Sequence, residues 1–97
     1  MAAYLIVDLE VSDPEKIAEY RRAAGPTVVK HGGRLLVGNG AREVLEGSWT
    51  PKELIIIEFP SMQELKNWYN SPEYRPLIEL RKTCQSPNDM TFFMDGI

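Results

Sequence analysis

A chain of 97 residues can build one domain around a single hydrophobic core, and we expect residues 1–97 to form one such domain. With 43% hydrophobic and 26% charged residues, the composition is that of a soluble globular protein, and no apolar run is long enough to span a bilayer. The net charge is −3 and the basic residues are spread along the chain, which argues against nucleic acid as a partner.

The first predicted elements are a strand and a helix. Residues 3–11 alternate between two faces, one of them entirely apolar, which is typical of a half-buried strand. Residues 12–14 supply a helix cap and a first-turn proline, and apolar residues follow at helical spacing as far as Val28. Because proline removes a backbone donor and crowds the preceding turn, Gly25 and Pro26 predict a kink or a break of this helix into two pieces.

Two more strands follow the helix. Gly32 and Gly33 are typical of a helix end with a left-handed residue, and residues 34–37 then predict a strand that ends in a turn. Residues 53–59 predict the third strand, which is apolar on both faces at its centre. Between these two strands lies an irregular connection that carries a large indole, Trp49.

The second half of the chain adds a helix, restarted once, and a last strand. Ser61 and Glu64 form a capping box ahead of an amphipathic run. Ser71 and Pro72 are typical of a new helix start, with the serine as cap and the proline at the first helical position. Residues 90–94 nearly alternate and predict the fourth strand.

The predicted order is β, α, β, β, α, β, which is the pattern of a ferredoxin-like split βαβ fold. In this α+β fold, a four-stranded antiparallel sheet carries both helices on one face. The other face would then expose Tyr4, Ile6, Leu54 and Ile56, an apolar surface too large to stay in contact with water. We therefore expect a homodimer that forms through this sheet face.

Five short motifs occur together in the chain: Asp13-Pro14 with Tyr20, His31-Gly32-Gly33-Arg34, Glu46-Gly47-Ser48-Trp49-Thr50-Pro51, Glu58-Phe59-Pro60-Ser61 and Trp68-Tyr69-Asn70-Ser71-Pro72-Glu73-Tyr74. In this order they resemble the domain-of-unknown-function family 1330 over nearly the whole chain, and Arg81 stands where that family usually has an arginine. The resemblance implies a dimeric α+β barrel, in which two sheets face each other and each subunit can keep a small cavity between helices and sheet. It does not imply one activity, because the superfamily includes cofactor-free oxygenases, small-ring isomerases, haem-degrading enzymes and members with no known activity.

His31 is the only imidazole in the chain, and it is therefore the candidate for a general base that titrates near neutrality. A histidine in the last turn of a helix also stabilises the helix terminus, and we favour this structural interpretation. Other residues are accepted at this position in the family pattern, which weakens the catalytic interpretation.

Arg34 and Arg81 are candidates to bind an anionic ligand, because a guanidinium presents a planar fork of donors. Each could instead pair with Glu46, Glu58 or Asp8 inside the protein, and we favour that structural pairing. Asp8 and Glu58 could also act together as acid and base, although a place at the rim of the dimer interface is the simpler interpretation.

Four aromatic residues could line a pocket for a flat organic ligand. Trp68 fits the buried stripe of its helix and is expected in the core. Tyr69 and Tyr74 flank the helix restart, where cavities often occur, so a pocket role and a core role stay open for both. Trp49 lies on a loop and could reach the partner subunit.

The chain offers little for a metal site, because one histidine and the single Cys84 lie far apart in sequence. We expect no cofactor. A single cysteine cannot form an intrachain disulfide, and the first residues lack the pattern of a secretory signal, so we expect a cytoplasmic protein.

Two functional hypotheses follow. The first is a homodimer with a small, mostly apolar pocket in each subunit, lined by Trp49, Tyr69 and Tyr74. Either arginine would orient an anionic group there, and His31 would move a proton if the protein is an oxygenase or isomerase of small aromatic or keto-acid metabolites. The alternative is a non-enzymatic binding or assembly module. An open cavity between helices and sheet would favour the first hypothesis, and a sealed interface would favour the second.

Overall fold

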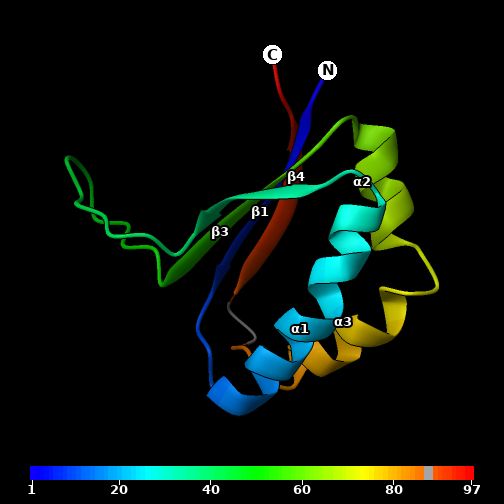
Figure 1. The fold of residues 1–97 in the computed structure, drawn as a ribbon. Helices are drawn as coiled ribbons and strands as arrows, with labels where there is room; N and C mark the ends of the chain where they lie inside the picture. The colour runs from blue at the N-terminus through cyan, green and yellow to red at the C-terminus, as the bar shows by residue number, and fades with distance from the viewer. Residues whose placement is uncertain (87–88) are drawn as a thin grey trace.

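The computed structural model describes residues 1–86 and 89–97, which form four strands and three helices (Figure 1). In chain order these are β1 (Ala3–Leu9), α1 (Pro14–Lys30), β2 (Arg34–Gly38), β3 (Glu53–Phe59), α2 (Met62–Tyr69), α3 (Arg75–Lys82) and β4 (Met90–Asp95). The strands pair antiparallel in the order β2-β3-β1-β4, and the helices lie together on one face of the sheet. This is the ferredoxin-like arrangement that the sequence predicts. In these two stretches of chain, no helix combines the length and the hydropathy that a membrane crossing requires.

The first helix, α1, is continuous through Gly25 and Pro26, so the predicted break into two pieces is wrong. A proline costs a helix the hydrogen bond to the carbonyl four residues earlier, here that of Arg22. Arg22 is exposed, so water can reach this part of the helix and bind the carbonyl instead. Ala24 and Val28, on either side of the proline in sequence, pack in the core and hold both parts of the helix in place.

The tight connection between α1 and β2 depends on two glycines. Gly32 has a φ of +79°, a left-handed conformation that favours glycine. A Cβ on Gly33 would lie 2.6 Å from Val28 Cγ1 and 2.8 Å from Phe59 Cε1, so a larger residue does not fit between helix and sheet at this point. Within β2, the pairing register with β3 shifts after Leu35, which places a β-bulge in this strand.

The predicted helix restart at Ser71 and Pro72 lies too early in the sequence, because α3 begins later and has Pro76 in its first turn. Ser71 instead closes the turn between α2 and α3. Its hydroxyl donates to the carbonyl of Trp68 at 2.7 Å and accepts from the backbone N–H of Tyr74 at 3.2 Å. This turn places Tyr74, whose side chain is fully buried, against α1.

The hydrophobic core lies between the sheet and the helices. One face of β1 is buried on this side, as the alternation predicts: Ala3, Leu5, Val7 and Leu9. These residues pack with a group from β3, the helices and the turn before α3 that includes Phe59, Leu65, Trp68, Tyr74 and Ile78. The core is therefore built from one side of the sheet alone.

The opposite side of the sheet, which we call the open face, is apolar and is not covered by any helix in the described part of the chain. Ile6 lies at its centre, directly opposite Ile56 of β3 and Phe92 of β4. On β4, Phe92 is 42% exposed and Met94 is 53% exposed. A continuous apolar surface of this kind is typical of a protein interface.

Residues 39–52 connect β2 to β3 and form an arm that projects away from the helices (Figure 1). Arg42 holds the base of this arm, because its guanidinium donates to the carbonyls of Pro51 and Lys52. Further out, Leu45 is 90% exposed and Trp49 is 63% exposed. The arm thus carries apolar side chains into solvent rather than onto its own domain.

Candidate functional site

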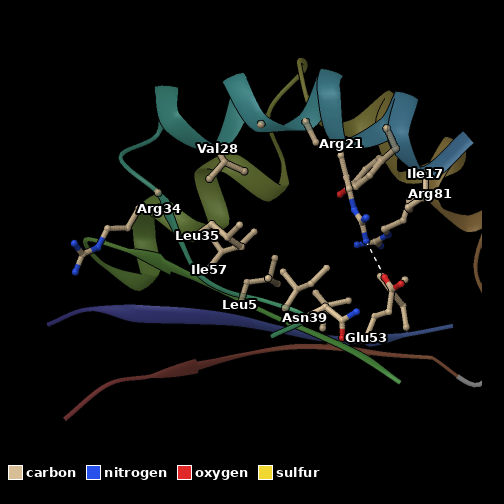
Figure 2. Close-up of a pocket in the computed structure, with 18 of the residues that line it drawn as sticks. Leu5, Ile17, Arg21, Val28, Arg34, Leu35, Asn39, Glu53, Ile57 and Arg81 are labelled. Carbon is tan, nitrogen blue, oxygen red and sulfur yellow. Dashed lines mark hydrogen bonds and ion pairs between the residues drawn. The ribbon is translucent and has the colours of Figure 1, made fainter. Parts of the chain in front are cut away.

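A cavity of about 500 Å³ lies between α1 and the sheet (Figure 2). Its walls are mostly apolar and come from α1 and from strands β1, β2 and β3. The apolar lining residues include Leu5, Val7, Leu9, Ile17, Val28 and Ile57. Trp68 of α2 and Arg81 of α3 also line it. The cavity therefore lies between helices and sheet, where the resemblance implied one.

Four charged residues line the cavity: Arg21, Arg34, Glu53 and Arg81. Arg21 of α1 reaches across to Glu53 at the start of β3, with 2.9 Å between Nη2 and Oε2. Arg34 pairs at 2.9 Å with Glu58, one of the internal partners expected for it, and Figure 2 shows its guanidinium pointing away from the cavity. Two of the three arginine charges are thus balanced by a carboxylate of the same chain.

Arg81 differs from the other two arginines. It is 4% exposed, and no Asp or Glu in the described parts of the chain forms an ion pair with it. Its Nη1 donates to the Tyr74 hydroxyl at 3.3 Å, while its Nε has no hydrogen-bond partner among residues 1–86 and 89–97. The last turn of α3 favours a cation through the helix dipole, but this offsets only part of the cost of burying a guanidinium.

Two tyrosine hydroxyls stand beside Arg81. Tyr20 on α1 and Tyr74 share a hydrogen bond of 2.7 Å, and their rings meet edge to face. Burial raises the pKa of Tyr74 well above its ordinary value, and the neighbouring Tyr20 adds to this rise. Burial also raises the pKa of Tyr20, while its hydrogen bond with Tyr74 and the charge of Arg81 oppose the rise. Both phenols are therefore protonated at neutral pH and able to donate hydrogen bonds.

The aromatic residues of the predicted pocket do not come together. Tyr74 contacts Arg81 at the polar end of the cavity. Trp68 is in the core, as predicted, with its ring centroid 4.0 Å from that of Tyr74, and it also lines the cavity. Tyr69 packs against Trp68 with 6.1 Å between ring centroids and is not part of the cavity lining. Trp49 lies on the exposed arm and does not reach this cavity within its own chain.

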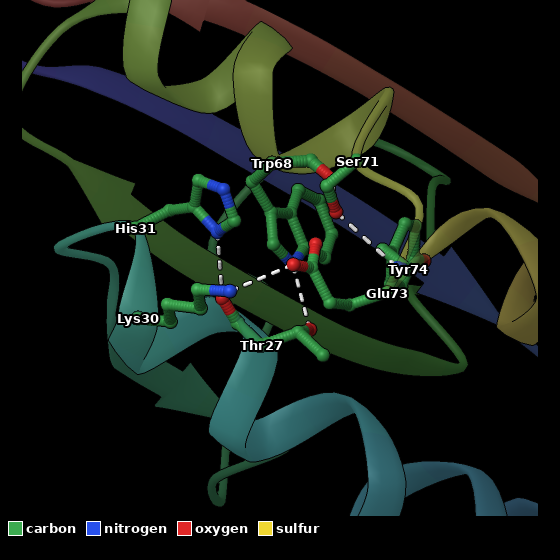
Figure 3. A network of polar contacts seen from close by, with 7 residues as sticks. All are labelled: Thr27, Lys30, His31, Trp68, Ser71, Glu73 and Tyr74. Atoms are coloured by element: carbon green, nitrogen blue, oxygen red, sulfur yellow. Dashed lines mark hydrogen bonds and ion pairs between the residues drawn. The ribbon is translucent and has the colours of Figure 1, made fainter.

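His31 belongs to a second polar network, outside the cavity lining (Figure 3). It is the C-cap of α1, and its Nδ1 lies 3.0 Å from the carbonyl oxygen of Thr27. The Thr27 hydroxyl accepts a hydrogen bond of 2.9 Å from the indole N–H of Trp68, and Lys30 pairs with Glu73 at 2.7 Å. His31 itself borders a shallow surface depression next to α2. These contacts agree with a helix-terminus role, and the catalytic role of His31 stays a prediction.

The two carboxylates considered as an acid and base pair are both engaged in contacts on the open face. Asp8 Oδ1 accepts a hydrogen bond of 2.7 Å from the backbone N–H of Lys52. Glu58 accepts from the Tyr4 hydroxyl at 3.2 Å and pairs with Arg34. In the described part of the chain, no group of three or more His, Cys, Asp or Glu side chains is placed to hold a metal ion.

Sequence reasoning missed Tyr20, Arg21 and Glu53 as cavity residues. For Tyr20 the sequence does contain a signal, because a hydroxyl-bearing side chain in the apolar stripe of a helix needs a buried hydrogen-bond partner. Arg21 and Glu53 give no comparable signal. Their pairing depends on how α1 crosses the sheet, which local sequence does not encode.

Solved structures that resemble this chain share its fold. A protein of unknown function from Rhodopseudomonas palustris matches with a TM-score of 0.78 at 18% identity, over 99% of this chain and 82% of that chain. SnoaB, a cofactor-independent oxygenase from Streptomyces nogalater, matches with a TM-score of 0.65 at 12% identity, over 98% of this chain and 92% of that chain. A dimeric ferredoxin-like protein of unknown function from Thermobifida fusca matches with a TM-score of 0.63 at 8% identity, over 99% and 92% of the two chains.

At these identities the likeness shows the fold alone, and none of the curated proteins compared with the chain matches it. The sequence does match one family along almost its whole length. Because this match covers residues 2–96, the chain belongs to the family of the domain of unknown function DUF1330.

Proposed function

We propose that the protein is a homodimer in which each subunit binds a small, mostly apolar organic molecule between α1 and the sheet. The observation that carries this proposal is the cavity of about 500 Å³, a volume within the range of ordinary ligand pockets. A protein selected only for assembly would be expected to seal the interface between helices and sheet. The open cavity therefore favours ligand binding over the alternative of a pure assembly module.

Filling the cavity from α1 tests the binding proposal. Ala24 is 6% exposed and lines the cavity, whereas its neighbour Ala23 is exposed, so Ala24→Leu and Ala23→Leu form a matched pair. Small organic acids and neutral aromatic compounds that raise the Tm of the unchanged protein should also stabilise Ala23→Leu. They should fail to stabilise Ala24→Leu. Equal Tm shifts in both variants would place the ligands elsewhere and contradict the proposal.

The apolar open face supports the homodimer part of the proposal. Docking two copies through this face would remove the row formed by Ile6, Ile56 and Phe92 from water. The arm projects away from the helices and Trp49 on it is exposed, which supports a contact of this side chain with a second copy. A second copy would then cover exposed apolar side chains of the first, such as Phe92 and Met94.

Light scattering of an interface variant tests the dimer. Ile56→Lys puts a charge in the centre of the open face and should convert the dimer to a folded monomer, because an unpaired buried charge is strongly unfavourable. Ala23→Lys, on the exposed surface of α1, should stay dimeric. A monomeric mass for the unchanged protein at micromolar concentration would refute the homodimer.

A second candidate is that the bound molecule also reacts, as in an oxygenase or isomerase of small aromatic or keto-acid metabolites. Glu53 is the carboxylate in the cavity lining and could accept a proton from a ligand carbon. An isomerase would return this proton to another carbon, and an oxygenase would pass the electron pair to dioxygen. Glu53→Gln should abolish turnover, while Arg21→Gln breaks the same ion pair but keeps the carboxylate and should retain it. Equal activity of the two variants would exclude this role for Glu53.

A further inference from the structure

We infer that the ligand of the cavity is a monocarboxylic acid, whose carboxylate pairs with Arg81 and whose hydrocarbon part fills the apolar remainder. This inference rests on the proposed ligand-binding function and names the chemical class of the ligand. It follows from the charges that line the cavity, from the burial of Arg81, and from the direction of the hydrogen bonds around it.

The charges of the cavity lining leave one positive charge without a counter-ion. Arg21 is balanced by Glu53, and Arg34 is balanced by Glu58. Arg81 is the remaining charged residue of the lining, and within residues 1–86 and 89–97 no carboxylate pairs with it. A ligand with a single negative charge would make the occupied cavity neutral, whereas a dianion would leave an excess charge in an apolar environment.

The burial of Arg81 makes this missing counter-ion significant. A guanidinium carries five N–H donors, and in the described residues Arg81 has an unmatched Nε and hydrogen bonds to the hydroxyls of Tyr74 and Tyr20 alone among side chains. Gln85 Oε1 is also buried without a partner, but Gln85 does not line the cavity. A charged side chain with 4% exposure is retained at a cost to stability unless something pairs with it.

The contacts of Tyr20 and Tyr74 determine which of the two hydroxyls can donate a hydrogen bond to a ligand. The Tyr74 hydroxyl accepts from Arg81, and its remaining neighbour in the described residues is the Tyr20 hydroxyl at 2.7 Å. If Tyr20 were the donor of that bond, the O–H of Tyr74 would be buried without an acceptor, which is costly. Tyr74 therefore donates to Tyr20, and the O–H of Tyr20 is left to donate into the cavity that Tyr20 lines.

Arg81 and Tyr20 thus both have N–H or O–H donors at the same end of the cavity. Figure 2 shows Arg81 reaching the end where the Arg21 and Glu53 pair closes the wall. A planar carboxylate matches a guanidinium and has a second oxygen for a phenol O–H. The remaining walls are mostly aliphatic, so the rest of the ligand should be hydrocarbon.

Paired ligands that differ in charge alone test the inference. In a Trp49→Phe background, Trp68 is the remaining tryptophan of the chain and reports from the cavity wall by fluorescence. Phenylacetate should bind at least about tenfold more tightly than phenylacetamide, and hexanoate more tightly than hexanamide, because a charged hydrogen bond is lost with each amide. Arg81→Met should remove the preference for the acids, and Tyr20→Phe should reduce it.

The matched control is Arg22→Gln, which removes an exposed arginine of α1 that is not part of the cavity lining. It should keep the preference for the acids. Equal binding of acids and amides, or an undiminished preference in Arg81→Met, would overturn the inference and leave the ligand-binding proposal standing. If none of the four compounds changed the Trp68 fluorescence at millimolar concentration, both the inference and that proposal would fail.

Discussion

Two polar clusters connect α1 to the rest of the helical layer, and they are built in opposite ways. Around Thr27, the indole N–H of Trp68 donates to the threonine hydroxyl (Figure 3). This hydroxyl in turn donates to the Ala24 carbonyl at 2.6 Å. Around Arg81, the buried guanidinium lies next to two phenols, and its Nε has no partner among the residues that the structure describes. The first cluster is closed and faces the core, while the second is incomplete and faces a cavity.

This difference distinguishes buried polar groups whose hydrogen bonds stabilise the fold from a buried charge that is not fully paired. A closed hydrogen bond in a buried site contributes modestly to stability, but removing one of its two partners is costly. Removing an unpaired buried charge has the opposite effect on the free energy of unfolding, because the desolvation cost of that charge is removed with it. Substitutions in the two clusters should therefore change stability in opposite directions.

The largest effect is expected for Thr27→Val, which keeps the shape of the side chain but removes the hydroxyl. The buried indole N–H of Trp68 then loses its acceptor, and the free energy of unfolding should fall by about 1–3 kcal/mol. Urea unfolding followed by circular dichroism measures this difference. Thr27→Ser retains the hydroxyl, so its free energy of unfolding should fall by less. Thr83→Val removes an exposed hydroxyl and serves as the comparison. A loss no greater than that of Thr83→Val would show that the closed cluster is not stabilising.

A smaller effect of the opposite sign is expected for Arg81→Met. The thioether side chain fills a similar space without a charge, so the free energy of unfolding should stay the same or rise by about 1 kcal/mol in buffers without carboxylates. The lost hydrogen bond to Tyr74 limits this gain. Destabilisation of more than about 1 kcal/mol in the same urea experiment would show that the contacts of Arg81 stabilise the fold, and would contradict the proposed difference between the two clusters.

The smallest effect is expected at the rim of the closed cluster, where Lys30 lowers the pKa of Glu73 from 4.5 to about 2. Because the folded pKa lies below the unfolded value, the ion pair stabilises the protein above pH 4.5, and this contribution is lost as the pH falls through 2. Glu73→Gln should therefore be slightly less stable than the unchanged protein at pH 6, and this difference should disappear as the pH falls below 2. Both side chains are exposed, so the difference at pH 6 should shrink in high salt. A difference that is independent of pH would contradict this assignment.

The fold could be predicted from sequence to a large extent, because β1 alternates clearly, β3 is a short apolar run between turns, and each helix has a cap or a proline at its start. Residues 53–59 and the ferredoxin-like order of elements are confirmed as predicted. The break at Pro26 was not a safe prediction, because the contacts of Ala24 and Val28 with the core outweigh one lost backbone bond.

The candidate site could be predicted only in part. Arg81 was recognisable as a ligand candidate, but whether it has an ion pair depends on which carboxylates the fold brings near it, and none pairs with it among the described residues. Glu58 lies on the open face and pairs with Arg34 there, which no local pattern reveals. Trp49 and Tyr69 share the aromatic character of Tyr74 but not its position, since one is on the arm and the other at the end of α2.

The bulge in β2 has a consequence for how the sheet behaves at high concentration. An edge strand with regular, unpaired backbone groups invites the addition of further strands, and a bulge disrupts that template. The sheet has two edges, and the one formed by β2 is interrupted after Leu35 and leads directly into the arm. Strand addition and aggregation should therefore begin at the other edge of the sheet, which is formed by β4.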